Sequence, residues 1–165
     1  MRPIVVEVRG QVAAPIERVF DVFMPIDLRK IMVGFGPLPA VVAIEDQTGD
    51  WDSVGESRII RLADGHGMLE VLTSVDRPQR FAYTVSELTN ILRYLVLRFH
   101  GEWIFEAVPA ATPSLEEPAV TRATWRYSFE PRSILTKPIA GFVVKRFWRP
   151  CMQQALELAT AEVAS

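Results

Sequence analysis

The sequence predicts an α+β domain in which one curved, seven-stranded antiparallel sheet wraps around a long C-terminal helix, with two short helices after the first strand. Stretches of alternating apolar and polar residues, which are typical of half-buried strands, follow one another through most of the chain. Short turn sequences separate them, and parallel neighbours would need long crossovers, so the strands are expected to run antiparallel. From Ser133 onward the apolar spacing becomes helical.

Length and composition limit the possible classes of protein. The 165 residues fit a single domain, residues 1–165, with room for a full core and a cavity. Apolar residues make up 49% of the chain, an excess that a cavity, a subunit interface or a membrane would accommodate. No stretch approaches the roughly 20 consecutive apolar residues of a membrane span. The net charge of −2 argues against a nucleic-acid-binding surface, and the lone Cys151 permits no intrachain disulfide, so we expect a cytoplasmic protein.

The first third of the chain predicts one strand and two helices. Residues 4–12 alternate as a strand does. Pro15 suits the first position of a helix, where its missing N–H costs nothing. Asp27 can cap a second, short helix that ends near Met32. The apolar face of the first helix comprises Ile16, Val19, Phe20 and Phe23.

Six further strands and one helix account for most of the remaining chain. Gly49-Asp50 and Asp64-Gly65 are hairpin signals, and a Pro/Ala/Glu-rich loop is expected at residues 109–118. The strands are expected at residues 41–45, 56–63, 68–75, 81–88, 97–108 and 120–129. The helix should begin near Pro138 and be kinked at residues 146–150, because Pro150 lies inside it. Its apolar stripe comprises Trp148, Met152, Ala155, Leu156, Ala159 and Val163.

Five short motifs occur in order along nearly the whole chain. They are VAAPIERVF at residues 12–20, GESR at 55–58, DRPQRFAY at 76–83, GEW at 101–103 and TWRYSFEP at 124–131. In this order the chain resembles the START-like (SRPBCC) helix-grip superfamily, in particular its polyketide cyclase/dehydrase-like branch. The resemblance implies the fold, but not an activity, because the superfamily includes carriers, receptors, cyclases and oxygenase domains.

Metal and nucleotide cofactors have no support in the sequence. Rieske-type oxygenases of the superfamily hold iron in a His/carboxylate site, and His66 and His100 do not form a matching helical pair. No CxxC, HExxH, P-loop or GxGxxG motif is present. We therefore expect no metal and no cofactor.

A cavity is expected between the sheet and the C-terminal helix. Aromatic side chains alternate onto one face of the strands at 97–108 and 120–129, where they either line the cavity or pack as ordinary core. Arg58 lies near a strand end, where it can turn into the cavity mouth, whereas Arg61 and Glu70 are expected to form an exposed pair across the Asp64-Gly65 hairpin. The predicted cavity residues are Phe23, Arg58, Tyr83, Phe99, Trp103, Tyr127, Trp148 and Met152.

Residues 89–96 interrupt two strands and are apolar apart from Arg93 and the polar pair at their start. A simple hairpin turn would be polar. Three interpretations stay open: a lid over the cavity, an oligomer contact, or a continuation of the strand. The lid or interface residues would be Ile91, Leu92, Tyr94 and Leu95.

The function that these patterns favour is binding of a hydrophobic small molecule, such as a lipid, a polyketide, a quinone or an aromatic metabolite. One alternative is a polyketide aromatase/cyclase-type enzyme, which would shape its substrate and use Tyr83, Tyr127 or Arg58 to donate protons or orient carbonyls. Another is a protein-interaction module, such as a homodimer that uses residues 91–96. No catalytic residue can be assigned from the sequence.

Overall fold

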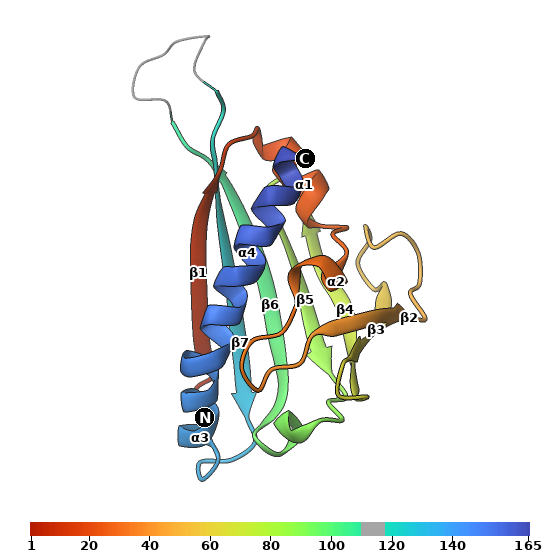
Figure 1. Ribbon diagram of the computed structural model, residues 1–165, viewed down its shortest axis with the longest axis vertical. Coiled ribbons are helices and arrows are strands. Elements are labelled where there is room, and N and C mark those ends of the chain that lie inside the picture. The colour runs from red at the N-terminus through yellow and green to blue at the C-terminus, as the bar shows by residue number, and fades with distance from the viewer. Residues whose placement is uncertain (110–117) are drawn as a thin grey trace.

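The computed structural model describes residues 1–109 and 118–165, so most of the loop expected at 109–118 lies outside the described residues. Seven strands form one antiparallel sheet in the spatial order β1-β7-β6-β5-β4-β3-β2, and the C-terminal helix lies across one face of it (Figure 1). Two short helices connect the two edge strands, β1 and β2. The predicted α+β helix-grip architecture is confirmed.

The elements follow the expected order, and each strand boundary lies within two residues of its predicted position. The strands are β1 (Ile4–Val12), β2 (Val41–Glu45), β3 (Ser57–Leu62), β4 (Gly67–Asp76), β5 (Arg80–Ser86), β6 (Val96–Ala107) and β7 (Thr121–Pro131). The helices are α1 (Ile16–Phe23), α2 (Leu28–Ile31), the 3-10 helix η1 (Ile91–Tyr94), α3 (Lys137–Val143), the π-helical turn η2 (Val144–Trp148) and α4 (Arg149–Ala164).

Local chemistry sets the ends of the two short helices. Pro15 is the N-cap of α1, with extended backbone, and not its first helical residue as predicted. The fixed φ of proline suits both positions, and its missing N–H leaves no orphan donor in either. Asp27 caps α2 as expected, because its carboxylate accepts a hydrogen bond from the backbone N–H of Arg29 at 3.0 Å.

The sheet bends at irregular points in its hydrogen-bond ladder. The register shifts between Val41 and Ala43, between Leu72 and Ser74, and between Val96 and Arg98. An extra residue on one strand bends that strand and increases its twist, which lets a sheet curve around a helix. Curvature of this kind allows a space to remain between the sheet and the helix.

The C-terminal helix contains a wide turn where its proline lies. Pro150 cannot donate to the carbonyl four residues earlier, and its ring crowds that carbonyl. The structure relieves this in η2, which ends at Trp148, two residues before Pro150, and where the helix widens to π geometry. The irregularity predicted at residues 146–150 is therefore present as an inserted π turn. Pro138 lies in the first turn of α3, as expected.

Aromatic residues form the core beneath the helix. β6 and β7 are neighbours, as expected, and their register places Trp103 directly opposite Trp125, with the two rings stacked at 4.5 Å. Phe20 of α1 packs edge-on against both Phe81 and Phe105. Among the described residues, no helix is both long enough and apolar enough to cross a bilayer.

Candidate functional site

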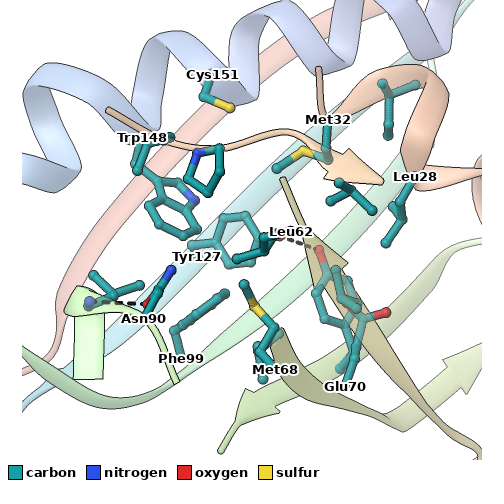
Figure 2. Close-up of a pocket in the computed structure, with 18 of the residues that line it drawn as sticks. Leu28, Met32, Leu62, Met68, Glu70, Asn90, Phe99, Tyr127, Trp148 and Cys151 are labelled. Carbon is teal, nitrogen blue, oxygen red and sulfur yellow. Dashed lines mark hydrogen bonds between the residues drawn. The ribbon is translucent and has the colours of Figure 1, made fainter. Parts of the chain in front are cut away.

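A cavity of about 550 Å³ lies between the sheet, the α1–α2 segment and the C-terminal helix (Figure 2). Figure 2 shows Trp148 and Cys151 projecting from the helix on one side, with Phe99, Tyr127 and Glu70 on the sheet below them. Most lining residues are apolar or aromatic. A volume of this size falls within the range of small-molecule binding sites.

Seven of the eight predicted cavity residues line this space: Phe23, Arg58, Tyr83, Phe99, Trp103, Tyr127 and Trp148. Met152 is fully buried but is not among the lining residues. The cavity face of the C-terminal helix runs through Val143, Trp148 and Cys151. Cys151 and Met152 lie three and four residues after Trp148, on the same side of the helix, and it is Cys151 that borders the cavity while Met152 is buried in the core.

Arg58 and Glu70 form a buried ion pair in the cavity wall. They are paired in the register of β3 and β4, and Arg58 donates from Nε and Nη2 to Glu70 Oε1 at 2.9 and 2.7 Å. The side chains are only 7% and 5% exposed. Trp51 covers the guanidinium, with its ring centroid 3.9 Å away. Burial raises the pKa of Glu70 more than the attraction of Arg58 lowers it.

This pair corrects a prediction from the sequence. Arg61 does not pair with Glu70, because the turn after β3 sets Arg61 opposite Gly67. Arg61 instead donates to Glu45 of β2 at 2.9 Å, on the exposed surface. Arg58 lies within the ladder and is in phase with the buried Ile60, so it points inward along the strand's inner face.

Glu70 has one oxygen free for another partner. Oε1 accepts both hydrogen bonds from Arg58, and no hydrogen bond to Oε2 is present among the described residues. Glu70 also lines the cavity. A carboxyl oxygen without a protein partner, in an otherwise apolar space, is available to a polar group of a bound molecule.

Two tyrosine hydroxyls and an indole form a hydrogen-bonded group beside this pair. The hydroxyls of Tyr83 and Tyr127 lie 2.8 Å apart, and Trp125 Nε1 donates to the Tyr83 hydroxyl at 3.0 Å. Burial raises the pKa of both tyrosines, so both are neutral. Two hydroxyls have two hydrogens and the bond between them uses one, so one O–H remains available to the cavity.

Gly101 makes this arrangement possible. It lies opposite Tyr83 on one side and Tyr127 on the other, in the middle of β6. A Cβ at Gly101 would lie 2.3 Å from the nearest atom of the Tyr83 ring. Only glycine leaves room for that ring to lie against the strand, where its hydroxyl reaches Tyr127 and Trp125.

The side chains of Trp148 and Asn90 add a second set of polar atoms to the cavity wall. Trp148 is buried, and its indole Nε1–H has no hydrogen-bond partner among the described residues. The Asn90 side-chain oxygen accepts from the backbone N–H of Leu92 at 3.1 Å, so its NH₂ is the group left over. Indole can only donate, so this part of the cavity offers hydrogen-bond donors.

Comparison with known proteins identifies the family. The family model for polyketide cyclase / dehydrase and lipid transport matches residues 3–164. The chain belongs to this family. The relationship to the START-like helix-grip superfamily that the motifs predicted is thereby confirmed. A search of curated proteins finds no match.

Several solved structures share the fold of this protein, although their sequences are only distantly similar to it. Ara h 8.0201 is 15% identical, with a TM-score of 0.66 and 97% of each chain covered. Truncated norcoclaurine synthase from Thalictrum flavum is 16% identical, with a TM-score of 0.64 over 99% of this chain and 96% of that one. A protein from Arthrobacter aurescens is 15% identical, with a TM-score of 0.62 over 98% and 86%. At such identities the likeness shows the fold alone.

In this family member, residues 89–96 form a short helical segment at the cavity. Ile91 to Tyr94 are the 3-10 helix η1, and β6 begins only at Val96, so the segment is not a continuation of the strand. Leu92 is buried, whereas Ile91 and Tyr94 are 79% and 57% exposed. All four residues named for a lid or an interface, Ile91, Leu92, Tyr94 and Leu95, line the cavity.

Sequence reasoning missed four polar or reactive groups in this family member. The sequence predicts Glu70 on the surface, but its side chain is buried on the same face of β4 as the buried Leu72 and the half-buried Met68. The positions of Trp51 and Asn90 could not be predicted, because both lie in irregular segments where the spacing of apolar residues follows no repeat. Cys151 lines the cavity, where burial raises the pKa of its thiol to about 11. A thiol of that pKa is protonated at neutral pH and is a poor nucleophile.

Proposed function

We propose that this protein binds a hydrophobic small molecule that carries polar oxygen groups, in the cavity between the sheet and the C-terminal helix. The supporting observation is a space of about 550 Å³ whose walls are mainly apolar and aromatic, with a few polar groups directed into it. Sites for small ligands have this composition, in which apolar walls supply affinity and a few polar groups set orientation. Membership of a family described by polyketide cyclase, dehydrase and lipid transport functions agrees with it.

The polar groups narrow the chemistry of the ligand. Beside Glu70, a tyrosine O–H can donate and a carboxylate oxygen can accept, which suits a hydroxyl or phenol that does both. Near Trp148 and Asn90 the cavity offers N–H donors, which suit a carbonyl oxygen. A hydroxylated ketone, quinone or ester with an apolar skeleton meets both requirements.

The intrinsic fluorescence of the protein offers a direct assay. All four tryptophans of the chain, Trp51, Trp103, Trp125 and Trp148, line the cavity. Gently purified protein is examined by native mass spectrometry for a bound molecule, the adduct is extracted, and it is titrated back while the fluorescence is followed. We expect a one-to-one adduct and a saturable change in tryptophan emission.

A cavity-filling variant tests the location. Cys151→Trp places a large side chain in the space, whereas Cys151→Ser leaves the space open at the same position. We expect the first to lose the adduct and the second to keep it. Binding that survives Cys151→Trp unchanged, in a variant whose circular dichroism shows that it is folded, would place the ligand elsewhere and reject the proposal.

A second candidate function, a cyclase-type enzyme, is favoured by one observation. Glu70 is buried in the cavity beside Tyr83 and has a raised pKa, which keeps a carboxylic acid protonated closer to neutral pH. Such an acid can donate a proton to a substrate carbonyl. The fold accommodates enzymes, since norcoclaurine synthase has been solved in complex with dopamine and hydroxybenzaldehyde. Glu70→Gln decides between the two functions: a binding protein retains its ligand, whereas an enzyme that uses this proton loses turnover.

A further inference from the structure

One end of the molecule exposes an unusual number of large apolar side chains. It consists of η1, residues 132–136 and the part of the C-terminal helix from α3 to Arg146, and we call it the mouth face (lower part of Figure 1). Its exposed apolar residues are Ile91, Tyr94, Ile134, Leu135, Ile139 and Phe142, each more than half exposed. Gathered apolar side chains on a surface are a sign of an interaction site.

The segments that form this face are basic and contain no acidic residue. Residues 88–101 and 131–156 contain seven Lys and Arg and no Asp or Glu, although the chain has 20 acidic residues elsewhere. Local segments of this length in an acidic protein would ordinarily include several carboxylates. The mouth face therefore carries a concentrated positive charge that the net charge of −2 conceals.

The cations of the mouth face are unpaired, in contrast to those elsewhere. Among the residues that the structure describes, Arg93, Arg132, Lys137, Lys145 and Arg146 have no carboxylate within ion-pair distance. Ten of the other thirteen Lys and Arg form such pairs. The charge of this face is thus available to an external partner.

The cavity reaches the surface at this face. Ile91 and Tyr94 of η1 and Ile139 of α3 are exposed and also line the cavity. Arg132 joins the parts of the face, because its Nε donates to the Arg93 carbonyl at 2.6 Å and its backbone N–H donates to the Leu95 carbonyl at 2.9 Å. Ile91, Tyr94 and Ile139 therefore border an opening of the cavity, together with the exposed Asp64, and the cations of the mouth face lie on the same elements but do not line the cavity itself.

We propose that the mouth face docks on the surface of an anionic lipid membrane. Apolar side chains at the apex, such as Leu135 and Phe142, enter the interfacial layer, and the unpaired cations contact the anionic head groups. A surface that combines exposed apolar residues with Lys and Arg has the composition of an interfacial membrane-binding site. Docking in this orientation brings the cavity opening against the lipid, so an apolar ligand passes between them without crossing water.

Two other partners fit the face less well. A second copy of the chain in a two-fold dimer would place each unpaired cation near cations of the same set, which is electrostatically unfavourable. A nucleic acid would pair with the cations, but it offers no apolar environment to Ile134, Leu135 and Ile139. A membrane of anionic lipid satisfies both the charge and the apolar side chains.

Vesicle flotation tests the proposal. The protein is mixed with vesicles of phosphatidylcholine alone or of an equal mixture with phosphatidylglycerol, at low and at high salt. We expect flotation only with the anionic vesicles, and less of it at high salt. Lys145→Gln with Arg146→Gln should lower the membrane partition coefficient about 25-fold, since each cation near an anionic surface contributes roughly fivefold. Leu135→Ser with Phe142→Ser should lower it about tenfold or more.

Matched controls lie elsewhere on the surface. Val42 and Val54 are also more than half exposed, and Lys30 and Arg122 lie outside the mouth face, so Val42→Ser with Val54→Ser and Lys30→Gln with Arg122→Gln should float as the wild type does. Equal flotation with neutral vesicles, or equal losses in the control pairs, would overturn the proposal. So would light scattering that shows a dimer lost in the mouth-face variants, or equal affinity for duplex DNA. The adduct seen by native mass spectrometry should persist in every variant, so a failure of docking is distinct from a failure of ligand binding.

Discussion

Removing Arg58 while keeping Glu70 isolates a carboxylate in the interior, and this perturbation tests the account of the cavity wall. In the native protein the guanidinium donates two hydrogen bonds, at 2.9 and 2.7 Å, to one carboxylate oxygen. Arg58→Met keeps much of the apolar stem and removes the charge. The carboxylate then has no cationic partner among the described residues within ion-pair distance.

The magnitude follows from burial. Both side chains are at most 7% exposed, so solvent screens the pair little. Breaking a buried ion pair by removing one partner costs about 3–5 kcal/mol, because an uncompensated charge remains. The double variant Arg58→Met with Glu70→Leu leaves no unpaired charge in the interior. Its free energy of unfolding should be at most about 1 kcal/mol below that of the wild type, or above it.

Urea unfolding followed by tryptophan fluorescence measures these differences, and its pH dependence adds a second test. The pKa of Glu70 is raised in the folded state, so ionisation of this group opposes folding at pH values above the folded pKa. That penalty disappears as the pH falls below the unfolded pKa of about 4.3. Without Arg58 the pKa rises further, so Arg58→Met should gain stability relative to the double variant as the pH is lowered from neutral.

Three results would refute this reasoning. The first is a cost below about 1 kcal/mol for Arg58→Met, which would mean that water reaches Glu70. The second is a double variant as unstable as the single one, which would assign the loss to packing against Trp51 and not to the stranded charge. The third is a stability difference between the two variants that does not change with pH.

Other positions give further predictions. Gly101→Ala should destabilise the protein by about 1–3 kcal/mol, seen as a lower Tm, because its Cβ displaces the Tyr83 ring; Gly141→Ala, where nothing lies within 4 Å, is the control. Trp148→Phe removes an indole N–H that has no partner among the described residues, at some cost in packing because the ring lies against Phe99 and Phe129. Affinity for a carbonyl ligand should fall about 3–10-fold by titration, and equal affinity would remove Trp148 from recognition. Cys151, with a pKa of about 11, should resist iodoacetamide at neutral pH in the folded protein, and fast labelling would show an open cavity.

The fold could be predicted from the sequence because local signals agree with one another along the chain. Residues 4–12 alternate and form β1 over that same range, and Asp64-Gly65 lies between β3 and β4. Such signals depend on neighbouring residues only. The break in the C-terminal helix was also predictable, since Pro150 cannot complete a regular turn.

The site was less predictable, because its polar groups depend on register. Alternation alone places Arg58 on the same face as Ile60, but a charged residue in a strand is ordinarily solvated, and its partner is fixed by the length of the turn. The turn sets Arg61 opposite Gly67, three residues from the expected Glu70. The helical repeat places both Cys151 and Met152 on the side of Trp148, so it does not decide which of the two borders the cavity.

The two kinds of polar group in this protein imply different stages in the capture of a ligand. Arg93, Arg132, Lys145 and Arg146 of the mouth face are exposed and have no ion-pair partner among the described residues, so they act at long range and are screened by salt. Glu70, Tyr83 and Tyr127 are buried, so they act only at contact and are insensitive to salt. Encounter with a charged surface should therefore weaken with ionic strength, whereas retention of a bound ligand should not. A ligand off-rate that rises with salt would mean that the cavity is open to bulk water. The assignment of encounter to the mouth face and of retention to the buried polar groups would then be rejected.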